Sequence, residues 1–116
     1  MKIEKFEDII AWKKSEELTL LIYSAFKNSR DFGFKDQICR ASVSIMNNIA
    51  EGFERRGDKE LSKFLFIAKG SCGEVRSMLY LASKLKYISE KERLQMNILS
   101  LEISKMLSNF IKTLNN

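Results

Sequence analysis

The sequence predicts an all-α protein that folds as an antiparallel up-down-up-down four-helix bundle. Its 116 residues include no proline and only five glycines, a composition that favours long, uninterrupted helices. Apolar residues recur every three or four positions in four successive stretches, which is the spacing of one helix face. Short breaks with turn and cap residues separate these stretches, as in a bundle whose neighbouring helices run in opposite directions.

The length and composition predict a single domain over residues 1–116. A hydrophobic content of 45% is too high for a disordered chain. No run of about 18 apolar residues is present, so we expect a cytoplasmic protein without a membrane span. The net charge of +5, from 20 basic and 15 acidic residues, permits nucleic-acid binding without requiring it.

The first helix is predicted from Glu7 or Asp8 to about Ser29, with both acids near its positive end. Between Leu18 and Phe26 the apolar residues almost surround the helix. A helix in a small monomeric bundle needs only one buried stripe. The wider apolar surface predicts that another copy of the chain covers part of this helix.

The next break, residues 30–34, should turn at Gly33 and place Phe32 and Phe34 as plugs at the bundle end. The second helix then extends from about Lys35 to about Glu54. After it, the sequence ERRGD predicts a second break. There Gly57 is expected to terminate the helix and Asp58 to cap the following one.

The third helix is predicted from about Lys59 to Lys86 and carries a sustained heptad seam. Its residues are Leu61, Leu65, Ala68, Cys72, Val75, Leu79 and Ala82. Gly70 and Gly73 lie within this helix, where each costs about 1 kcal/mol relative to Ala. The compensation we predict is close approach of a neighbouring helix.

A capping box formed by Ser89 and Glu92 marks the start of the fourth helix. Three-four spacing then continues to the C-terminus. The residues of this stripe are Met96, Leu99, Ile103, Met106, Phe110 and Leu114.

The absence of histidine excludes several kinds of catalytic and metal site. Zinc sites of the Cys/His kinds, di-iron Glu-x-x-His sites and nucleophile–His pairs all need that residue. Cys39 and Cys72 are expected to be buried, reduced thiols. We therefore predict a non-enzymatic protein with no cofactor and no metal. The alternative is a small-ligand-binding or enzymatic bundle that uses the polar face of the second helix, with Glu51 and Glu74 as its embedded acids.

That polar face has Gln, Ser and Asn at helical spacing, which favours a partly buried, hydrogen-bonded surface. Its residues are Gln37, Arg40, Ser44, Asn48, Glu51 and Arg55. A separate basic cluster, in and after the second break, consists of Arg55, Arg56, Lys59 and Lys63. Two arginines beside a helix N-terminus can contact nucleic-acid phosphate, although ordinary solvated turn residues have the same composition.

The run QICRASVSIMNNIAEG over residues 37–52 resembles the signature of the 23S rRNA intervening-sequence protein family. Further matches are Phe6, Asp8 and Trp12 near the start; Phe64, Leu65, Ala68, Gly70, Ser71 and Glu74 in the third helix; and Leu79, Ala82 and Tyr87 beyond them. The resemblance covers nearly the whole chain.

The resemblance implies a small bacterial cytoplasmic protein that forms a barrel-shaped homopentamer of antiparallel bundles. Some family members are labelled as ribosomal proteins. The accessory variability protein of diversity-generating retroelements is similar in fold and pentameric state; it is basic and binds nucleic acid and a reverse transcriptase. For most of the family no activity is established.

Together these observations predict a non-enzymatic homo-oligomer whose basic surface contacts RNA or DNA; a protein-interaction scaffold without a nucleic-acid role is the alternative. A polar network at or near the subunit interface is expected from seven residues, namely Gln37, Arg40, Ser44, Asn48, Glu51, Ser71 and Glu74. An unpaired charge buried there would be costly. Replacing Arg40 or Glu51 by alanine should therefore shift assembly as well as stability.

Overall fold

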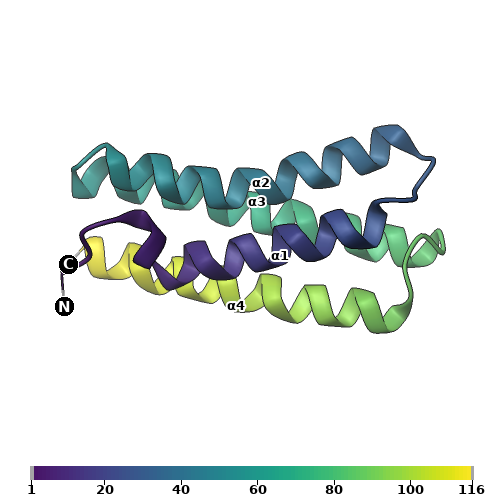
Figure 1. Ribbon diagram of the computed structural model, residues 1–116. Helices are drawn as coiled ribbons and strands as arrows, with labels where there is room; N and C mark the ends of the chain where they lie inside the picture. The colour runs from purple at the N-terminus through teal and green to yellow at the C-terminus, as the bar shows by residue number, and fades with distance from the viewer. Residues whose placement is uncertain (1, 116) are drawn as a thin grey trace.

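The computed structural model describes residues 2–115, which form an all-α fold without a strand in that range. A 3₁₀ turn, η1 (Phe6–Asp8), precedes four helices: α1 (Ile10–Phe26), α2 (Phe32–Glu54), α3 (Asp58–Lys84) and α4 (Glu90–Leu114). The α1–α2 and α3–α4 connections lie at one end of the elongated molecule (Figure 1). The α2–α3 connection lies at the other end, beside the start of α1 and the end of α4. None of the helices formed by the described residues combines the length and apolar character that a bilayer crossing requires.

Helix α1 is shorter than predicted at both ends. Glu7 and Asp8 belong to the 3₁₀ turn, and Ile9 after them is extended, with φ −73° and ψ 120°. The Ile9 side chain is buried in the core, so packing interrupts the helix where local sequence favours its continuation. The helix also ends at Phe26 rather than near Ser29.

Helix α2 begins at Phe32, three residues before the predicted start, because Asp31 caps it. The Asp31 carboxylate accepts a hydrogen bond from the Phe34 N–H at 3.1 Å and satisfies one donor of the first turn. Gly33 therefore lies inside the helix and does not form the turn. The predicted end of α2 at Glu54 is confirmed.

The predicted roles of Gly57 and Asp58 in the second break are wrong. Arg56 takes the left-handed conformation, with φ 61°, and Gly57 is the extended N-cap residue. Asp58 is the first residue of α3, and its negative charge interacts favourably with the positive end of the helix dipole. Its side chain does not cap the helix. By contrast, the capping box of α4 is confirmed. Ser89 accepts from the Glu92 N–H at 3.1 Å, and Glu92 accepts from the Ser89 N–H at 2.9 Å.

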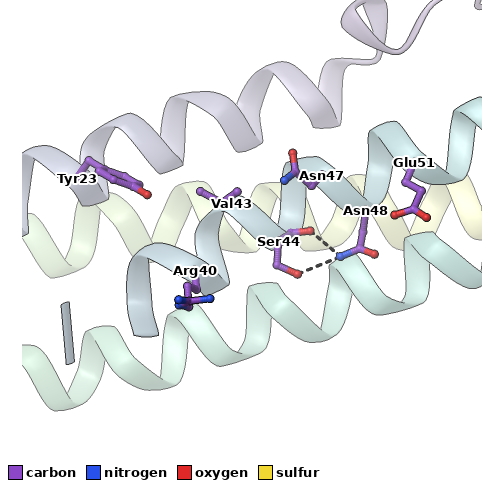
Figure 2. Close-up of a pocket in the computed structure, with 7 residues that line it drawn as sticks. All are labelled: Tyr23, Arg40, Val43, Ser44, Asn47, Asn48 and Glu51. Atoms are coloured by element: carbon purple, nitrogen blue, oxygen red, sulfur yellow. Dashed lines mark hydrogen bonds between the residues drawn. The ribbon is translucent and has the colours of Figure 1, made fainter. Parts of the chain in front are cut away.

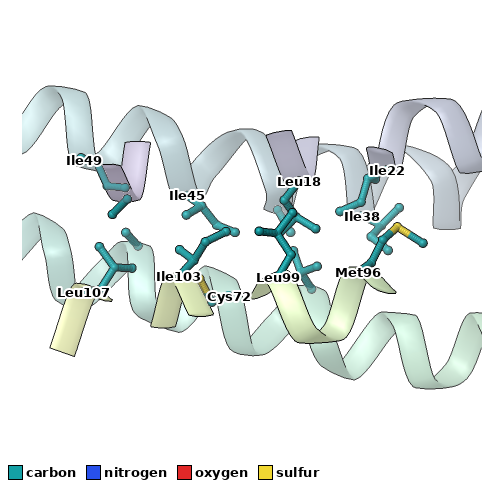
Figure 3. Packing of buried hydrophobic residues seen from close by; sticks show 14 of the residues in the cluster. Leu18, Ile22, Ile38, Ile45, Ile49, Cys72, Met96, Leu99, Ile103 and Leu107 are labelled. Atoms are coloured by element: carbon teal, nitrogen blue, oxygen red, sulfur yellow. The ribbon is translucent and has the colours of Figure 1, made fainter. Parts of the chain in front are cut away.

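The predicted heptad seam of α3 is confirmed, since all seven of its residues are buried. They pack against apolar residues of the other helices, several of which Figure 3 shows, including Leu18, Ile45 and Ile103. In α4 the first half of the predicted stripe is buried as expected. Further along, Leu107 and Ile111 are the fully buried residues, while the predicted Met106, Phe110 and Leu114 are only partly buried against the core. A helix of 3.6 residues per turn drifts away from a strict seven-residue repeat, which explains this change.

Among the glycines of the chain, Gly52 of α2 is the one that lies tightly against another helix. A Cβ atom there would lie 2.6 Å from Phe64 Cβ and 3.2 Å from Leu61 Cδ1 of α3. At Gly70 a Cβ would meet nothing within 4 Å, and at Gly73 only the Arg76 guanidinium at 3.9 Å. The close approach expected at Gly70 and Gly73 is therefore not made by a helix among residues 2–115.

Phe34 closes one end of the bundle, and Phe32 does not. The Phe34 ring lies 5.8 Å from Phe26 and 5.5 Å from Tyr87, measured between centroids. Phe32 is 73% exposed, because the early start of α2 turns it away from the core.

The same end is fastened by Tyr87, whose hydroxyl donates to Asp31 Oδ2 at 2.7 Å. This bond, followed by that from the Phe34 N–H, lowers the pKa of Asp31 below its usual value. A carboxyl whose pKa is depressed by folding stabilises the native state above its unfolded pKa of about 3.9. That contribution is lost as the pH falls through the lower folded value.

Replacing Tyr87 by phenylalanine is expected to raise the pKa of Asp31 toward its usual value, because only the Phe34 N–H remains to stabilise the carboxylate. The measurement is an NMR titration of the Asp31 carboxyl carbon. Tyr80→Phe, which removes the hydroxyl of an exposed tyrosine within α3, is the matched control and should leave this pKa unchanged. An Asp31 titration identical in Y87F and wild type would contradict the expectation.

Candidate polar site and basic turn

The polar face of α2 lines a shallow pocket of about 410 Å³. Tyr23 of α1 borders it, and all other lining residues come from α2 (Figure 2). The α2 residues are Arg40, Val43, Ser44, Asn47, Asn48 and Glu51. Four of these were predicted as members of the polar network.

Three of the seven predicted network residues form a connected cluster between α2 and α3. The Asn48 Nδ2 donates to the Ser44 carbonyl oxygen at 2.7 Å and to Ser44 Oγ at 2.9 Å (Figure 2). Ser44 Oγ in turn lies 3.0 Å from Ser71 Oγ of α3, which is buried. These neutral groups hydrogen-bond to one another, so the cluster joins the two helices.

The other four predicted residues do not join this cluster. Gln37 Nε2 donates to Glu74 Oε2 at 3.4 Å, in a separate and exposed α2–α3 contact. Arg40 Nε donates to Asp36 Oδ2 at 2.8 Å, and the Arg40 side chain is 79% exposed. Glu51 pairs with Arg55 at 2.8 Å, also on the surface. These residues share a helical spacing, but they spread over a wide part of the α2 surface. Only some of them face α3.

In the basic turn between α2 and α3, only some of the predicted cationic side chains are free of a carboxylate partner among the described residues. Arg55 contacts the carboxylates of Glu51 and Glu60, at 2.8 and 3.4 Å, and lies over the Phe64 ring at 5.0 Å. Arg56, Lys59 and Lys63 are exposed, and no carboxylate of residues 2–115 lies within 4.0 Å of their charged groups.

The N-terminus of α3, where the turn composition predicted contact with phosphate, carries two acidic residues. Asp58 and Glu60 stand in its first turn and already supply negative charge to the positive helix end. A phosphate at the same place would meet two carboxylates. Any phosphate contact therefore depends on the side chains of Arg56, Lys59 and Lys63.

Residues 7–109 match the 23S rRNA-intervening sequence protein family. The chain therefore belongs to the 23S rRNA-intervening sequence protein family. A solved structure supports the same relationship: a protein of unknown function from Bacteroides thetaiotaomicron, assigned to the S23 ribosomal protein family. The two are 28% identical with a TM-score of 0.83, over 89% of this chain and 99% of that one. No curated protein sequence matches the chain.

In this member of the family, sequence reasoning singled out Gly70 and Gly73 but missed the large apolar residues that accompany them on the outer side of α3 and α4. We call the whole set the α3–α4 face: Phe66, Gly70, Gly73, Tyr80, Leu94, Ile98 and Leu101. Its large members are all exposed. On each helix they follow a four-three spacing, as the core seam does, so this repeat is the signal that could have revealed them.

Proposed function

We propose that this member of the 23S rRNA-intervening sequence family is a non-enzymatic assembly protein. Copies of its up-down-up-down bundle associate into a homopentamer, which contacts nucleic acid through exposed basic side chains. The number five rests on the family resemblance. The observation that carries self-association is the α3–α4 face, because aligned exposed apolar residues of this kind mark interaction surfaces.

The glycines support the same proposal. Gly70 and Gly73 weaken α3 without serving a contact among the described residues. A helix of another copy, packed against this flat stretch, supplies the missing reason for them.

Nucleic-acid contact is supported by the uneven distribution of charge. Residues 55–116 contain 12 basic and 6 acidic residues, whereas residues 1–54 contain 8 and 9. Arg56, Lys59 and Lys63 extend this basic half to the end of the bundle where α2 meets α3. Lysine and arginine side chains that neutralise phosphates release counterions, which makes the affinity depend on salt.

The absence of catalysis in this proposal is supported by the polar face itself. The Ser44–Asn48–Ser71 cluster is hydrogen-bonded internally, and the charged residues at the pocket are exposed. A cytoplasmic setting suits the two cysteines, which are buried and free. Burial raises the pKa of Cys72 to about 11, so that thiol stays protonated and unreactive.

The test is a salt titration of binding to ribosomal RNA fragments and to random duplexes, on protein whose mass has been measured by light scattering. Wild type is compared with R56Q/K59Q/K63Q. If these side chains neutralise phosphates of duplex DNA, the slope of log affinity against log salt should fall by roughly 0.9 for each phosphate left without its cation. The matched control is K27Q/R30Q/K86Q, which removes the same charge from the opposite end of the bundle.

An equal slope in the two triple variants would remove the basic turn from the nucleic-acid interface. An intact wild-type oligomer that binds no nucleic acid at low salt would leave the interaction scaffold as the function. A wild-type monomer would contradict self-association.

A further inference from the structure

We infer that the interface between copies joins two different surfaces: the outer side of α1 in one copy docks on the α3–α4 face of the next. The α1 face consists of Glu16, Glu17, Leu20 and Tyr23. This inference rests on the self-association part of the proposed function and specifies its partner as a second copy in a defined orientation.

The shape of the α3–α4 face fits an apolar helix side. On α3, Gly70 and Gly73 form a floor over which an added Cβ would meet almost nothing. Phe66 and Tyr80 lie on either side of this floor along the helix, and both are exposed. The α4 row borders the same line between the helices, because Arg93 covers the Tyr80 ring at 4.9 Å and Arg76 reaches Ser100 at 3.3 Å.

Arg93 of this region is paired with Glu90, at 2.9 Å from Nε to Oε1, but the other cationic groups lack a negative partner in the described part of the chain. The Arg76 guanidinium is half-buried between α3 and α4, and its Nη1 donates to Ser100 Oγ. No carboxylate of residues 2–115 lies within 4.0 Å of it. Lys69 and Lys105 are exposed on the same two helices. One turn from Ser100, the buried Asn97 Oδ1 has no hydrogen-bond partner within the described residues.

The α1 face offers exposed apolar surface and carboxylates, which complement the apolar and cationic side chains of the α3–α4 face. Leu20 is 66% exposed and Tyr23 is also exposed, so α1 presents apolar surface that its own bundle does not cover. Glu16 and Glu17 beside them are exposed, with no cationic group within 4.0 Å in the described part of the chain. Apolar surface and opposite charge therefore coincide on the two faces.

Other occupants of the α3–α4 face fit less well. A second α3–α4 face would bring Lys69, Arg76 and Lys105 against like charges, which disfavours a symmetric pairing of this face with itself. A protein surface that binds nucleic acid is polar and strongly positive, whereas five large apolar side chains dominate this one. An interface between unlike surfaces also leaves one of each face unused at every step, so it repeats and closes into a ring when the rotation allows.

The experiment uses two full-length variants that each damage one face, L20D on α1 and I98D on α4. Each alone is expected to be a monomer by light scattering, near the chain mass of 13.5 kDa. When they are mixed, the intact α1 face of I98D should bind the intact α3–α4 face of L20D. Because the other two faces are damaged, growth stops at a heterodimer of twice the chain mass. Far-UV circular dichroism verifies that each variant is folded.

The matched control is I10D, which places a carboxylate on an exposed isoleucine outside both faces and should keep the wild-type mass. A mixture of L20D and I98D that stays monomeric, while wild type is oligomeric, would overturn this inference and leave self-association intact. Retention of the wild-type mass by either single variant, or dissociation of I10D, would also overturn it. A monomeric wild type would overturn the proposed self-association as well.

Discussion

Phe26→Ala is expected to lower the free energy of unfolding by about 4 kcal/mol. The Phe26 ring is 1% exposed and packs 5.8 Å from the Phe34 ring at the closed end of the bundle. Its removal exchanges buried apolar contacts for a cavity, and the surrounding helices can close that cavity only in part. Urea denaturation of the two proteins, followed by circular dichroism at one protein concentration, measures the difference.

The matched control is Phe32→Ala, in which the same ring is removed from a position six residues further along the chain. Phe32 is largely solvated, so its loss is expected to change the free energy of unfolding by no more than about 0.5 kcal/mol. Similar costs for the two substitutions would contradict the structure of this bundle end, because they would place both rings in the core.

Gly52→Ala is expected to destabilise the protein by about 3 kcal/mol, although alanine is the better helix former. The new methyl group would lie 2.6 Å from Phe64 Cβ and 3.4 Å from the Leu61 carbonyl oxygen. Neither atom can be moved by a rotamer change, since Cβ and the carbonyl are fixed to the backbone of α3. The two helices must therefore separate at Gly52 to make room for the methyl group.

Gly33→Ala provides the comparison for the intrinsic helix preference. Gly33 lies in the first turn of α2, and a Cβ there would meet only the Asp31 carboxylate, at 4.0 Å. This substitution should be neutral or stabilise by up to about 1 kcal/mol, because alanine loses less backbone entropy on folding. Chemical denaturation of both variants is the measurement. A stabilising effect at Gly52 would show that α2 and α3 are further apart than the structure has them.

The polar cluster has a structural role within one chain, and its predicted place at a subunit interface stays a prediction. Ser44, Asn48 and Ser71 connect α2 to α3 within one chain, on the same pair of helices that approach closely at Gly52. Arg40 and Glu51, by contrast, have their partners on the α2 side of the surface, at Asp36 and Arg55. Their expected influence on assembly stays a prediction, and it would act through the exposed pocket rather than through a buried network.

The sequence by itself determined the all-α class, the four helices, the α3 core seam, the α4 capping box and the family. Each depends on residues close along the chain: a seam on three-four spacing, a capping box on four consecutive residues, and the family signature on one run of α2. Helix propensity and burial of one stripe act within a few turns, so these features can be read without knowing which helices are neighbours.

Only the tertiary structure decided how each helix is rotated about its own axis and where it begins against its neighbours. That rotation splits the predicted polar network, buries Leu107 more fully than Met106, and gives the close approach to Gly52 instead of Gly70 and Gly73. It also turns the α3–α4 face outward. The physical reason is that the packing of four helices is settled by their side chains collectively, through contacts between residues far apart in sequence.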